Sequence, residues 1–570
     1  MHRCHLPLAL LLTVATTTAL LLAGRHQGFT RDEGYYFQAA EMHVAYYEEA
    51  LAGFASGKPW TFVDRRVIDR WFSYNSEHPP LMKTLFGLSW RLLHRCRCPE
   101  ERGLHPIAYL RRHRTLGLLS QGEAMRLPAA GLAGILVGAV YLLGARMFGR
   151  GAGLVAAALT ILAPRHFFHA QLACFDAPIA AMMFLTTAAY YMAQTTGRRR
   201  WLVATGVLAG LSIATKHNAY FLPFVLLLHS LWARRHLLKA KDVPRWRAAL
   251  RVVLAPWIGA MALLSVPVYL LTWPWLWHDT LRRFAAYVAF HLHHVHYNIE
   301  YLGQNYNRPP FPWHYVPVVT LLTTPVTTMV LALVGAVLGL AGLRRSWAQG
   351  KPDGAPGLLI ALGVLWPMLL IARPGTPIFG AEKHWLPFMP FLALAAGFGY
   401  TRLWQWCSAA FALSPRQRQL LGGVLAGVLI VPPLLEVRRS HPYGLSHYNA
   451  LAGGPQGGAD LGMNRQFWGY AVRGLFPYLN RHAPPGAGIY WHDANLYQIQ
   501  MSMKDGLLRR DLRDTGLEEP GVRASDMALV IHEKHFNKYE YWIWDAYGTT
   551  RPDEVLTHEG VPVVTLYSRR

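Results

Sequence analysis

The sequence predicts an α-helical membrane protein with several spans, followed by a small α/β domain. Of the 570 residues, 52% are hydrophobic and only 15% are charged. Apolar stretches of about 20 residues, the length needed to cross a bilayer, recur along the chain. After residue 436 the sequence becomes polar, with turn signals and short alternating strands. We therefore assign residues 1–436 to a transmembrane domain and residues 437–570 to a soluble C-terminal domain.

The apolar stretches predict about eleven transmembrane helices. The first stretch follows Arg3 and His5 and also resembles a signal peptide, but no small-residue cleavage site comes after it. We therefore expect an uncleaved first span. The predicted spans are 6–24, 126–148, 151–168, 177–195, 201–216, 218–233, 252–273, 314–343, 357–372, 384–404 and 419–435.

The basic residues between the spans predict the orientation, because Lys and Arg gather in cytoplasmic loops. If the N-terminus is cytoplasmic, nearly every short basic cluster falls on the same side. These clusters are Arg146 and Arg150, Arg198 to Arg200, the segment from Arg234 to Arg251, Arg344 and Arg345 with Lys351, and Arg416 and Arg418. The first loop (25–123), the loop 274–313 and the C-terminal domain then lie outside the cytoplasm. We expect a cell inner membrane protein with its polar clusters on the periplasmic side.

Charge and cysteine content exclude other classes. The net charge of +24 comes from short clusters between apolar runs, without the basic stripe and interleaved aromatics typical of nucleic-acid binding. No pair of cysteines has CxxC or zinc-ligand spacing. Cys96 and Cys98 are expected to be free loop thiols, although a strained bridge or loose metal ligation remains open. The cysteines are Cys4, Cys96, Cys98, Cys174 and Cys407.

Two carboxylates, Asp32 and Glu33, follow the first span almost directly. Acidic residues beside a bilayer are costly unless they pair, face water or take part in chemistry. A carboxylate in this position is suited to act as a general base on a hydroxyl group. The alternative is that both residues only cap the helix that begins near Gly34.

A second cluster in the same loop is Glu77-His78-Pro79-Pro80-Leu81, with Lys83 two residues further on. The two prolines restrict the backbone, so Glu77 and His78 are presented on a rigid turn. Lys83 is positioned to meet an anion. The alternative is an ordinary Pro-Pro helix start with surface charges.

These motifs, in this order, resemble the GT-C glycosyltransferases. The resemblance is closest to the protein O-mannosyltransferase group (glycosyltransferase family 39) and its relatives, the lipid A aminoarabinose transferases. It spans roughly residues 25–450. The further motifs that carry it are Cys174-Phe175-Asp176-Ala177-Pro178, Gly210-Leu211-Ser212-Ile213-Ala214-Thr215-Lys216, Leu302-Gly303-Gln304, Pro312-Trp313-His314-Tyr315 and Lys383-His384-Trp385-Leu386-Pro387-Phe388-Met389-Pro390. The sequence departs from the family pattern at His217-Asn218 and Lys383-His384. It also lacks β-trefoil repeats, which weakens the case for a protein acceptor.

The resemblance implies a GT-C fold and transfer of a sugar, with inversion, from a polyprenyl phosphate to a hydroxyl of a lipid, glycan or protein. It implies Asp32 as the base, with Glu33 and Glu77 orienting acceptor or donor. Lys216 is the first candidate to receive the lipid phosphate; the alternative is that it only extends from its helix end to the membrane surface. Asp176 is expected to support the site or to cap a helix. The remaining candidates for substrate binding are Lys83, Arg31, His78, His217 and Lys383.

No cofactor is predicted with certainty, and a divalent metal remains open. The run from His291 to His296 invites a metal site, but its spacing also suits an interfacial helix, which we favour; His293 and His296 are alternatively placed to line an acceptor cavity. The rival function is a transporter or flippase of lipid-linked sugars, and a catalytically inactive scaffold is a third hypothesis. A transporter predicts charges in the middle of spans. Here the candidates gather at one membrane edge, which favours the enzyme.

Overall fold

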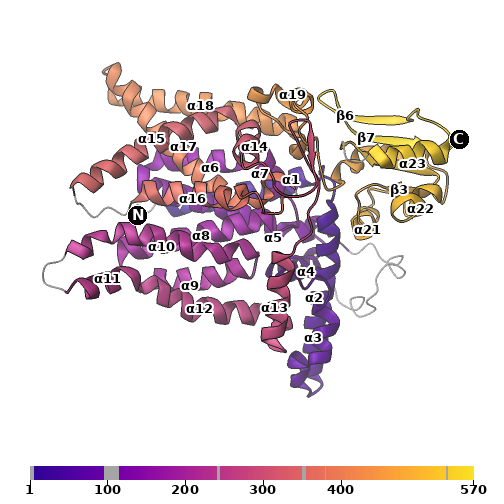
Figure 1. Cartoon of the computed structure of the whole chain (residues 1–570), viewed down its shortest axis with the longest axis horizontal. Coiled ribbons are helices and arrows are strands. Elements are labelled where there is room, and N and C mark those ends of the chain that lie inside the picture. The colour runs from indigo at the N-terminus through magenta and orange to yellow at the C-terminus, as the bar shows by residue number, and fades with distance from the viewer. Residues whose placement is uncertain are drawn as a thin grey trace.

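The computed structural model describes residues 5–95, 115–239, 244–349, 355–378, 380–533 and 537–569 (Figure 1). Most long helices lie side by side along the longest axis, and a β-sheet lies at the end of the molecule that carries the C-terminus. The helices up to residue 272 are α1 (His5–Gly24), α2 (Arg31–Ala55), α3 (Arg65–Phe72), α4 (Leu81–Leu93), α5 (Gln121–Phe148), α6 (Arg150–Ile161), α7 (Pro164–Ala170), α8 (Asp176–Thr196), α9 (Arg199–Ile213), α10 (Leu222–Ala233), α11 (Arg245–Val253) and α12 (Pro256–Thr272). The later helices are α13 (Thr280–Leu292), α14 (Tyr315–Thr323), α15 (Val326–Gln349), α16 (Pro356–Ala372), α17 (Met389–Ala410), α18 (Pro415–Ser440), α19 (Gly454–Asp460), α20 (Phe476–His482), α21 (Leu496–Lys504), α22 (Glu518–Arg523) and α23 (Asn537–Tyr547).

Every predicted span contains a helix, but not every helix is long enough to cross a membrane. Within the described residues, α1, α5, α15 (over Val326–Ser346) and α18 are long and apolar enough to cross a membrane, and α6 with α7 forms a fifth candidate bent by 73°. Helices α12 and α16 are apolar but shorter. By length and composition these helices support a multi-pass membrane protein. The number of eleven spans stays a prediction.

Close contact between α1 and α5 depends on small residues. A side chain at Gly134 would lie 2.3 Å from Oγ1 of Thr17, and one at Gly138 would lie 2.5 Å from Oγ1 of Thr13. Glycines four residues apart let two apolar helices approach until their backbones touch. This packing fixes the end of α1, and therefore the start of the first loop and of α2.

Helix α2 begins with a capping box. Oγ1 of Thr30 accepts from the Glu33 backbone N–H, and the Glu33 carboxylate accepts from the Thr30 backbone N–H. This arrangement satisfies two of the N–H groups that a helix start leaves free. It places Asp32 in the first turn, while α2 and α3 extend across the end of the helix bundle next to the sheet (Figure 1).

The C-terminal segment contains a five-stranded mixed sheet in the order β4-β3-β5-β7-β6. Strands β4, β3 and β5 are parallel, whereas β7 pairs antiparallel with both β5 and β6. A separate antiparallel pair, β1 and β2, lies in the loop before α14. The strands are β1 (Ile299–Tyr301), β2 (Gln304–Tyr306), β3 (Gly488–Trp491), β4 (Arg513–Asp514), β5 (Met527–Ile531), β6 (Glu554–His558) and β7 (Val561–Ser568).

The sheet shares a hydrophobic core with the first loop. On one face, Ile489 of β3 and Leu529 of β5 belong to the same buried cluster as Phe37 of α2 and Phe86 of α4. On the other face, α23 covers the sheet through Ile543. This shared core holds the sheet against the first loop, which carries residues of the candidate site. The predicted domain boundary at residue 436 falls inside α18, which continues to Ser440.

The cysteine predictions are only partly covered by the structure. Cys174 is buried and Cys407 is half-buried, and both are free thiols. Cys4, Cys96 and Cys98 lie outside the described residues, as does Lys351.

Candidate active site

Asp32 lies in the first turn of α2 between two cations. Its Oδ2 is 3.4 Å from Nζ of Lys383, and its Oδ1 is 3.9 Å from Nε of Arg31. The Asp32 side chain is 22% exposed, whereas that of Lys383 is only 5% exposed. A carboxylate that is held by cations and still open to solvent can accept a proton from an entering group.

Lys383, in the 3₁₀ turn η7 (Ala381–His384), links Asp32 to the other charged candidates. Its ammonium lies 4.2 Å from the ring centre of Trp468. Burial lowers the pKa of Lys383, Asp32 and Asp176 oppose this effect, and Lys216 and Arg31 lower the pKa further. The charges of Arg31, Asp32, Asp176 and Lys216 all influence the pKa of Lys383. These predicted site residues therefore lie around one centre.

Lys216 and Asp176 form a buried ion pair. Nζ of Lys216 donates to Oδ1 of Asp176 at 2.6 Å, with side chains 10% and 7% exposed. Asp176 begins α8, and Lys216 follows α9. The structure thus joins two residues that lie 40 positions apart in the sequence.

The Glu33 carboxylate is fully buried and engaged. Its Oε1 accepts from Nε of Arg126 at 2.7 Å and from the Ala173 N–H at 2.9 Å, and its Oε2 accepts from Nη2 of Arg126 and the Thr30 N–H, both at 2.8 Å. Because neither oxygen is free, the geometry favours a role in positioning α2 over the direct substrate contact expected from the sequence.

Lys83 is similarly occupied. Its Nζ donates to the backbone oxygens of Asn75 at 2.7 Å and His78 at 2.9 Å, and to Oδ1 of Asn75 at 3.3 Å. Burial lowers its pKa to about 7, although Glu77 opposes this effect. Lys83 therefore holds the 75–78 turn, a geometry that favours positioning over phosphate contact. Glu77, whose Oε1 accepts from Asn75 Nδ2 at 2.7 Å, stays partly exposed.

Imidazole rings gather beside Lys216. The rings of His217 and His291 lie 4.1 Å apart between centres, and those of His78 and His291 lie 6.1 Å apart. His217, His291, His294 and His384 line a largely apolar cavity of about 630 Å³, bounded by the 3₁₀ turn η4 (His217–Phe221), α13 and α16. A largely apolar cavity that also carries polar groups is suited to an amphipathic ligand.

Acid should destabilise the protein through these histidines. Burial lowers the pKa of His78 and of His217 well below the usual value, and lowers that of His291 to about 4. Between pH 6.5 and 4 the unfolded chain binds protons that the folded chain does not, so stability falls as the pH falls. We expect the Tm of the wild type to drop more between pH 7 and pH 5 than that of a variant with all three residues changed to Gln. Equal drops would contradict this origin.

Among the described residues, no group of three or more His, Cys, Asp or Glu side chains is arranged to hold a metal ion. His291 belongs to the last turn of α13, and His293 caps this helix. The interfacial location predicted for this run stays a prediction.

A second cavity, of about 350 Å³, lies between Arg31, Lys383 and the C-terminal sheet. Asp493 lines it and pairs with Nη1 of Arg31. Burial raises the pKa of Asp493, and Arg31 opposes this effect. Tyr35, Trp468 and Tyr539 add aromatic walls.

Sequence reasoning missed Asp493 and Glu533. His492-Asp493 directly follows β3, and His532-Glu533 directly follows β5, its parallel neighbour. Ligands in open α/β sheets bind outside the carboxyl ends of parallel strands. A polar pair directly after a short apolar strand was the available signal in both places, and the two pairs reach this cavity through Asp493, His492 and Glu533.

The fold and this site are those of a helical membrane protein with a charged centre at one end of its bundle. A family model described as dolichyl-phosphate-mannose-protein mannosyltransferase matches residues 115–259. Over that segment the match confirms the resemblance to the GT-C glycosyltransferases that the motifs predicted. A search among curated proteins found no match.

Several solved structures are similar over nearly the whole chain. ArnT from Cupriavidus metallidurans bound to undecaprenyl phosphate is 15% identical, with 98% of this chain and 97% of that chain covered and a TM-score of 0.44. The Archaeoglobus fulgidus oligosaccharyltransferase in its apo form is 12% identical, with 94% and 72% covered and a TM-score of 0.47. The archaeal oligosaccharyltransferase AglB from Archaeoglobus fulgidus, in complex with an inhibitory peptide and a dolichol-phosphate, is 10% identical, with 94% and 71% covered and a TM-score of 0.45.

Proposed function

We propose that this protein is an integral-membrane, inverting glycosyltransferase that moves a sugar from a polyprenyl phosphate to a hydroxyl group. One observation carries the proposal. The accessible carboxylate of Asp32 is paired with Lys383, and the turn 383–384 borders both cavities. Lys383 lines the polar cavity and His384 lines the apolar one. A base therefore stands where a polar acceptor and a lipid-linked donor would meet.

In the proposed reaction, Asp32 accepts the proton of the acceptor hydroxyl. The hydroxyl oxygen attacks the anomeric carbon from the face opposite to the phosphate. The bond between that carbon and the phosphate oxygen breaks, and the polyprenyl phosphate leaves with the electron pair. Cations near the leaving oxygen stabilise the charge that develops there.

The apolar cavity supports a prenyl donor. Its walls include Phe221, Leu292 and Leu370, and the imidazoles of His217, His291 and His384 provide polar groups within it. Lys216, directly before His217, is our candidate for the departing phosphate, because a lysine is an effective point charge for phosphate. Hydrogen bonds from neutral imidazoles would add to its effect.

The polar cavity supports the acceptor side. It combines aromatic side chains, which suit the apolar face of a sugar or lipid headgroup, with the carboxylates of Asp493, Glu518 and Glu533. The acceptor is a lipid, a glycan or a protein. Glu77, partly exposed in the first loop, is the remaining carboxylate suited to orienting a substrate.

We further propose that the site faces the periplasm from the cell inner membrane, with a cytoplasmic N-terminus. Helix α1 begins in the left half of the view, and the C-terminal sheet lies at the right end of the molecule (Figure 1). This separation, together with the basic clusters predicted to be cytoplasmic, supports the orientation.

The direct test is transfer of radiolabelled sugar from a panel of polyprenyl-phosphate sugars. The full chain is reconstituted in lipid, and total membrane extract provides acceptors. Label entering a product supports the transferase, and the active donor identifies the sugar. Labelled lipid that instead crosses the bilayer of sealed vesicles, without any transfer, would support a flippase.

Changing Lys216 to Gln should weaken donor use. A charged hydrogen bond contributes about 1.5–3 kcal/mol, so we expect KM for the donor to rise about tenfold to a hundredfold. Lys216→Arg should retain most of the affinity, and Arg282→Gln, at a side chain that is 82% exposed, serves as the charge-matched control. A donor KM that stays unchanged in Lys216→Gln would remove Lys216 from the phosphate site.

A further inference from the structure

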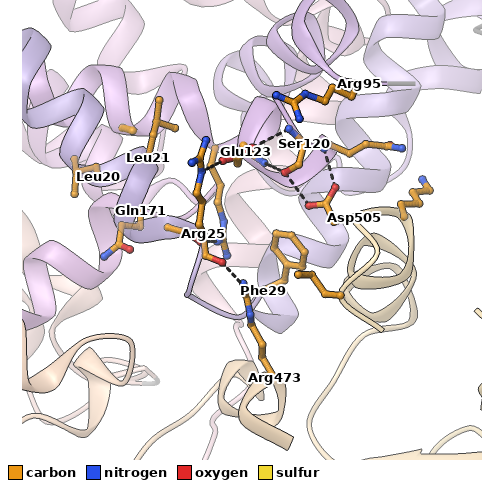
Figure 2. Close-up of a pocket in the computed structure, with 16 residues that line it drawn as sticks. Leu20, Leu21, Arg25, Phe29, Arg95, Ser120, Glu123, Gln171, Arg473 and Asp505 are labelled. Atoms are coloured by element: carbon orange, nitrogen blue, oxygen red, sulfur yellow. Dashed lines mark hydrogen bonds and ion pairs between the residues drawn. The ribbon is translucent and has the colours of Figure 1, made fainter. Parts of the chain in front are cut away.

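A third cavity, of about 380 Å³, lies outside the proposed active site (Figure 2). It is bounded by the end of α1, the start of α5, and the segments around Arg473 and Asp505 of the C-terminal domain. None of the predicted site residues lines it. The cavity therefore needs an explanation of its own.

Basic side chains dominate this cavity. The cations that line it are Arg25, Arg95, Arg126, Arg473 and Lys504, against the two carboxylates of Glu123 and Asp505. Three of the cations have an acidic partner: Arg25 pairs with Glu123, Arg126 with Glu33, and Lys504 with Glu41. Figure 2 shows Arg25, Arg95 and Arg473 arranged around the cavity.

Arg473 is a half-buried cation that has no carboxylate partner among the described residues. Its guanidinium donates to two backbone oxygens, that of Gln27 at 2.8 Å and that of Arg25. Burial, together with the charge of Arg126, lowers its pKa to about 10, although Asp505 opposes both effects. An anion bound in the cavity would relieve this uncompensated charge.

The carboxylate of Asp505, which also lines the cavity, does not pair with Arg473 but accepts hydrogen bonds from the start of α5. It accepts from the backbone N–H groups of Gln121 at 2.8 Å and Gly122 at 3.1 Å, and from Oγ of Ser120 at 3.1 Å. Asp505 thus caps the start of α5, as Figure 2 shows. Arg95, in turn, donates to the backbone oxygens of Gly117 and Leu118, both at 3.2 Å.

The opposite wall is apolar and belongs to a helix that is long and apolar enough to cross a membrane. Leu20 and Leu21 line the cavity from the last turns of α1, of which only 11% is buried inside the molecule. Ala130 of α5 adds to this wall. Gln171 also lines the cavity, and its buried Oε1 has no hydrogen-bond partner among the described residues. A basic pocket beside an apolar span end matches a lipid headgroup together with the start of its acyl chains.

We propose that this cavity binds the phosphate of an anionic membrane lipid, held by Arg473, Arg95 and Arg25, with the acyl chains beside Leu20 and Leu21. The ligand chemistry is that of a phosphate oxygen, for which guanidinium groups are well suited. Arg126 also lines the cavity and pairs with Glu33, the residue after Asp32. Lipid binding would therefore stabilise the start of α2. This site does not depend on the proposed transferase activity.

The test measures lipid binding directly, without any transfer assay. The full chain in detergent is titrated with short-chain phosphatidylglycerol, with the matching phosphatidylcholine, and with inorganic phosphate. We expect phosphatidylglycerol to bind at least about tenfold more tightly than either of the others, since charged hydrogen bonds and apolar contacts add. Inorganic phosphate that binds as tightly as phosphatidylglycerol would overturn the lipid assignment and indicate a soluble anion.

Two variants locate the site. Arg473→Gln should lower the affinity for phosphatidylglycerol by about tenfold or more, whereas Arg481→Gln, an exposed arginine on α20 that does not line the cavity, should leave it unchanged. Because Arg473 also ties two backbone oxygens, Arg25→Gln provides a second test at a side chain that is 54% exposed. Unchanged affinity in both cavity variants, each still folded by its Tm, would overturn the proposal.

Discussion

Replacing Asp32 by Asn should lower sugar transfer by about a thousandfold, within the hundredfold to ten-thousandfold range that a general base contributes. The amide keeps the size of the side chain but cannot take up the proton of the acceptor hydroxyl. Donor affinity should change little, because Lys216, the candidate residue for binding the donor phosphate, pairs with Asp176 and not with Asp32. The measurement is kcat and donor KM in reconstituted lipid.

A matched control is available on the same helix. Glu49 of α2 pairs with Arg70, whose side chain is 58% exposed, so Glu49→Gln removes an equal charge at a surface pair that contributes little. This control should retain full activity. If Asp32→Asn turned over at the rate of the control, Asp32 would not be the base, and Asp176 and Asp493 would be the next carboxylates to test.

Local features of the sequence were sufficient for parts of the fold. The apolar stretches predicted helices where helices occur, because burial in lipid requires both apolar side chains and internally paired backbone groups. Thr30 and Glu33 have capping-box spacing, which explains why α2 begins where it does. The end of the first apolar stretch and the capping box together place Asp32 in the first turn of α2, just after the first span.

Contacts between distant segments were not predictable in this way. Arg31 and Asp493 are separated by 462 positions, and Glu33 and Arg126 by 93. No local pattern marks such pairs, because each depends on how the sheet packs against the first loop. The environment of Lys83 was not predictable for the same reason. Its sequence context indicates an exposed cation, whereas in the fold it is buried and donates to the turn that it stabilises.

The second large effect should be on stability, at Glu33. Changing Glu33 to Gln should lower the stability by about 3–5 kcal/mol, the cost of removing one partner from a buried ion pair. Five donors meet the two oxygens of Glu33: two from Arg126, the N–H groups of Thr30 and Ala173, and the Thr30 hydroxyl. The amide nitrogen of Gln cannot accept, so at least two of these donors would face another donor. A clear fall in Tm is the expected measurement.

Glu123 supplies a structural control for this effect. It occupies the same third position of a capping box, with Ser120 as the cap, and it also pairs with an arginine. Because its partner Arg25 is 54% exposed, Glu123→Gln should cost only about 1 kcal/mol. Equal losses of stability at the two positions would show that capping, and not burial of the Arg126 pair, dominates at Glu33.

Measuring kcat and both KM values of Glu33→Gln, at a temperature below the Tm of the variant, shows whether Glu33 positions α2 or contacts a substrate. If Glu33 only fixes the first turn of α2, displacement of Asp32 lowers kcat while donor KM and acceptor KM stay near the wild-type values. A direct contact with either substrate would instead raise the KM for that substrate. The complete burial of the Glu33 side chain favours the first outcome, because a substrate could reach its oxygens only by displacing Arg126 or a backbone N–H that already donates to them.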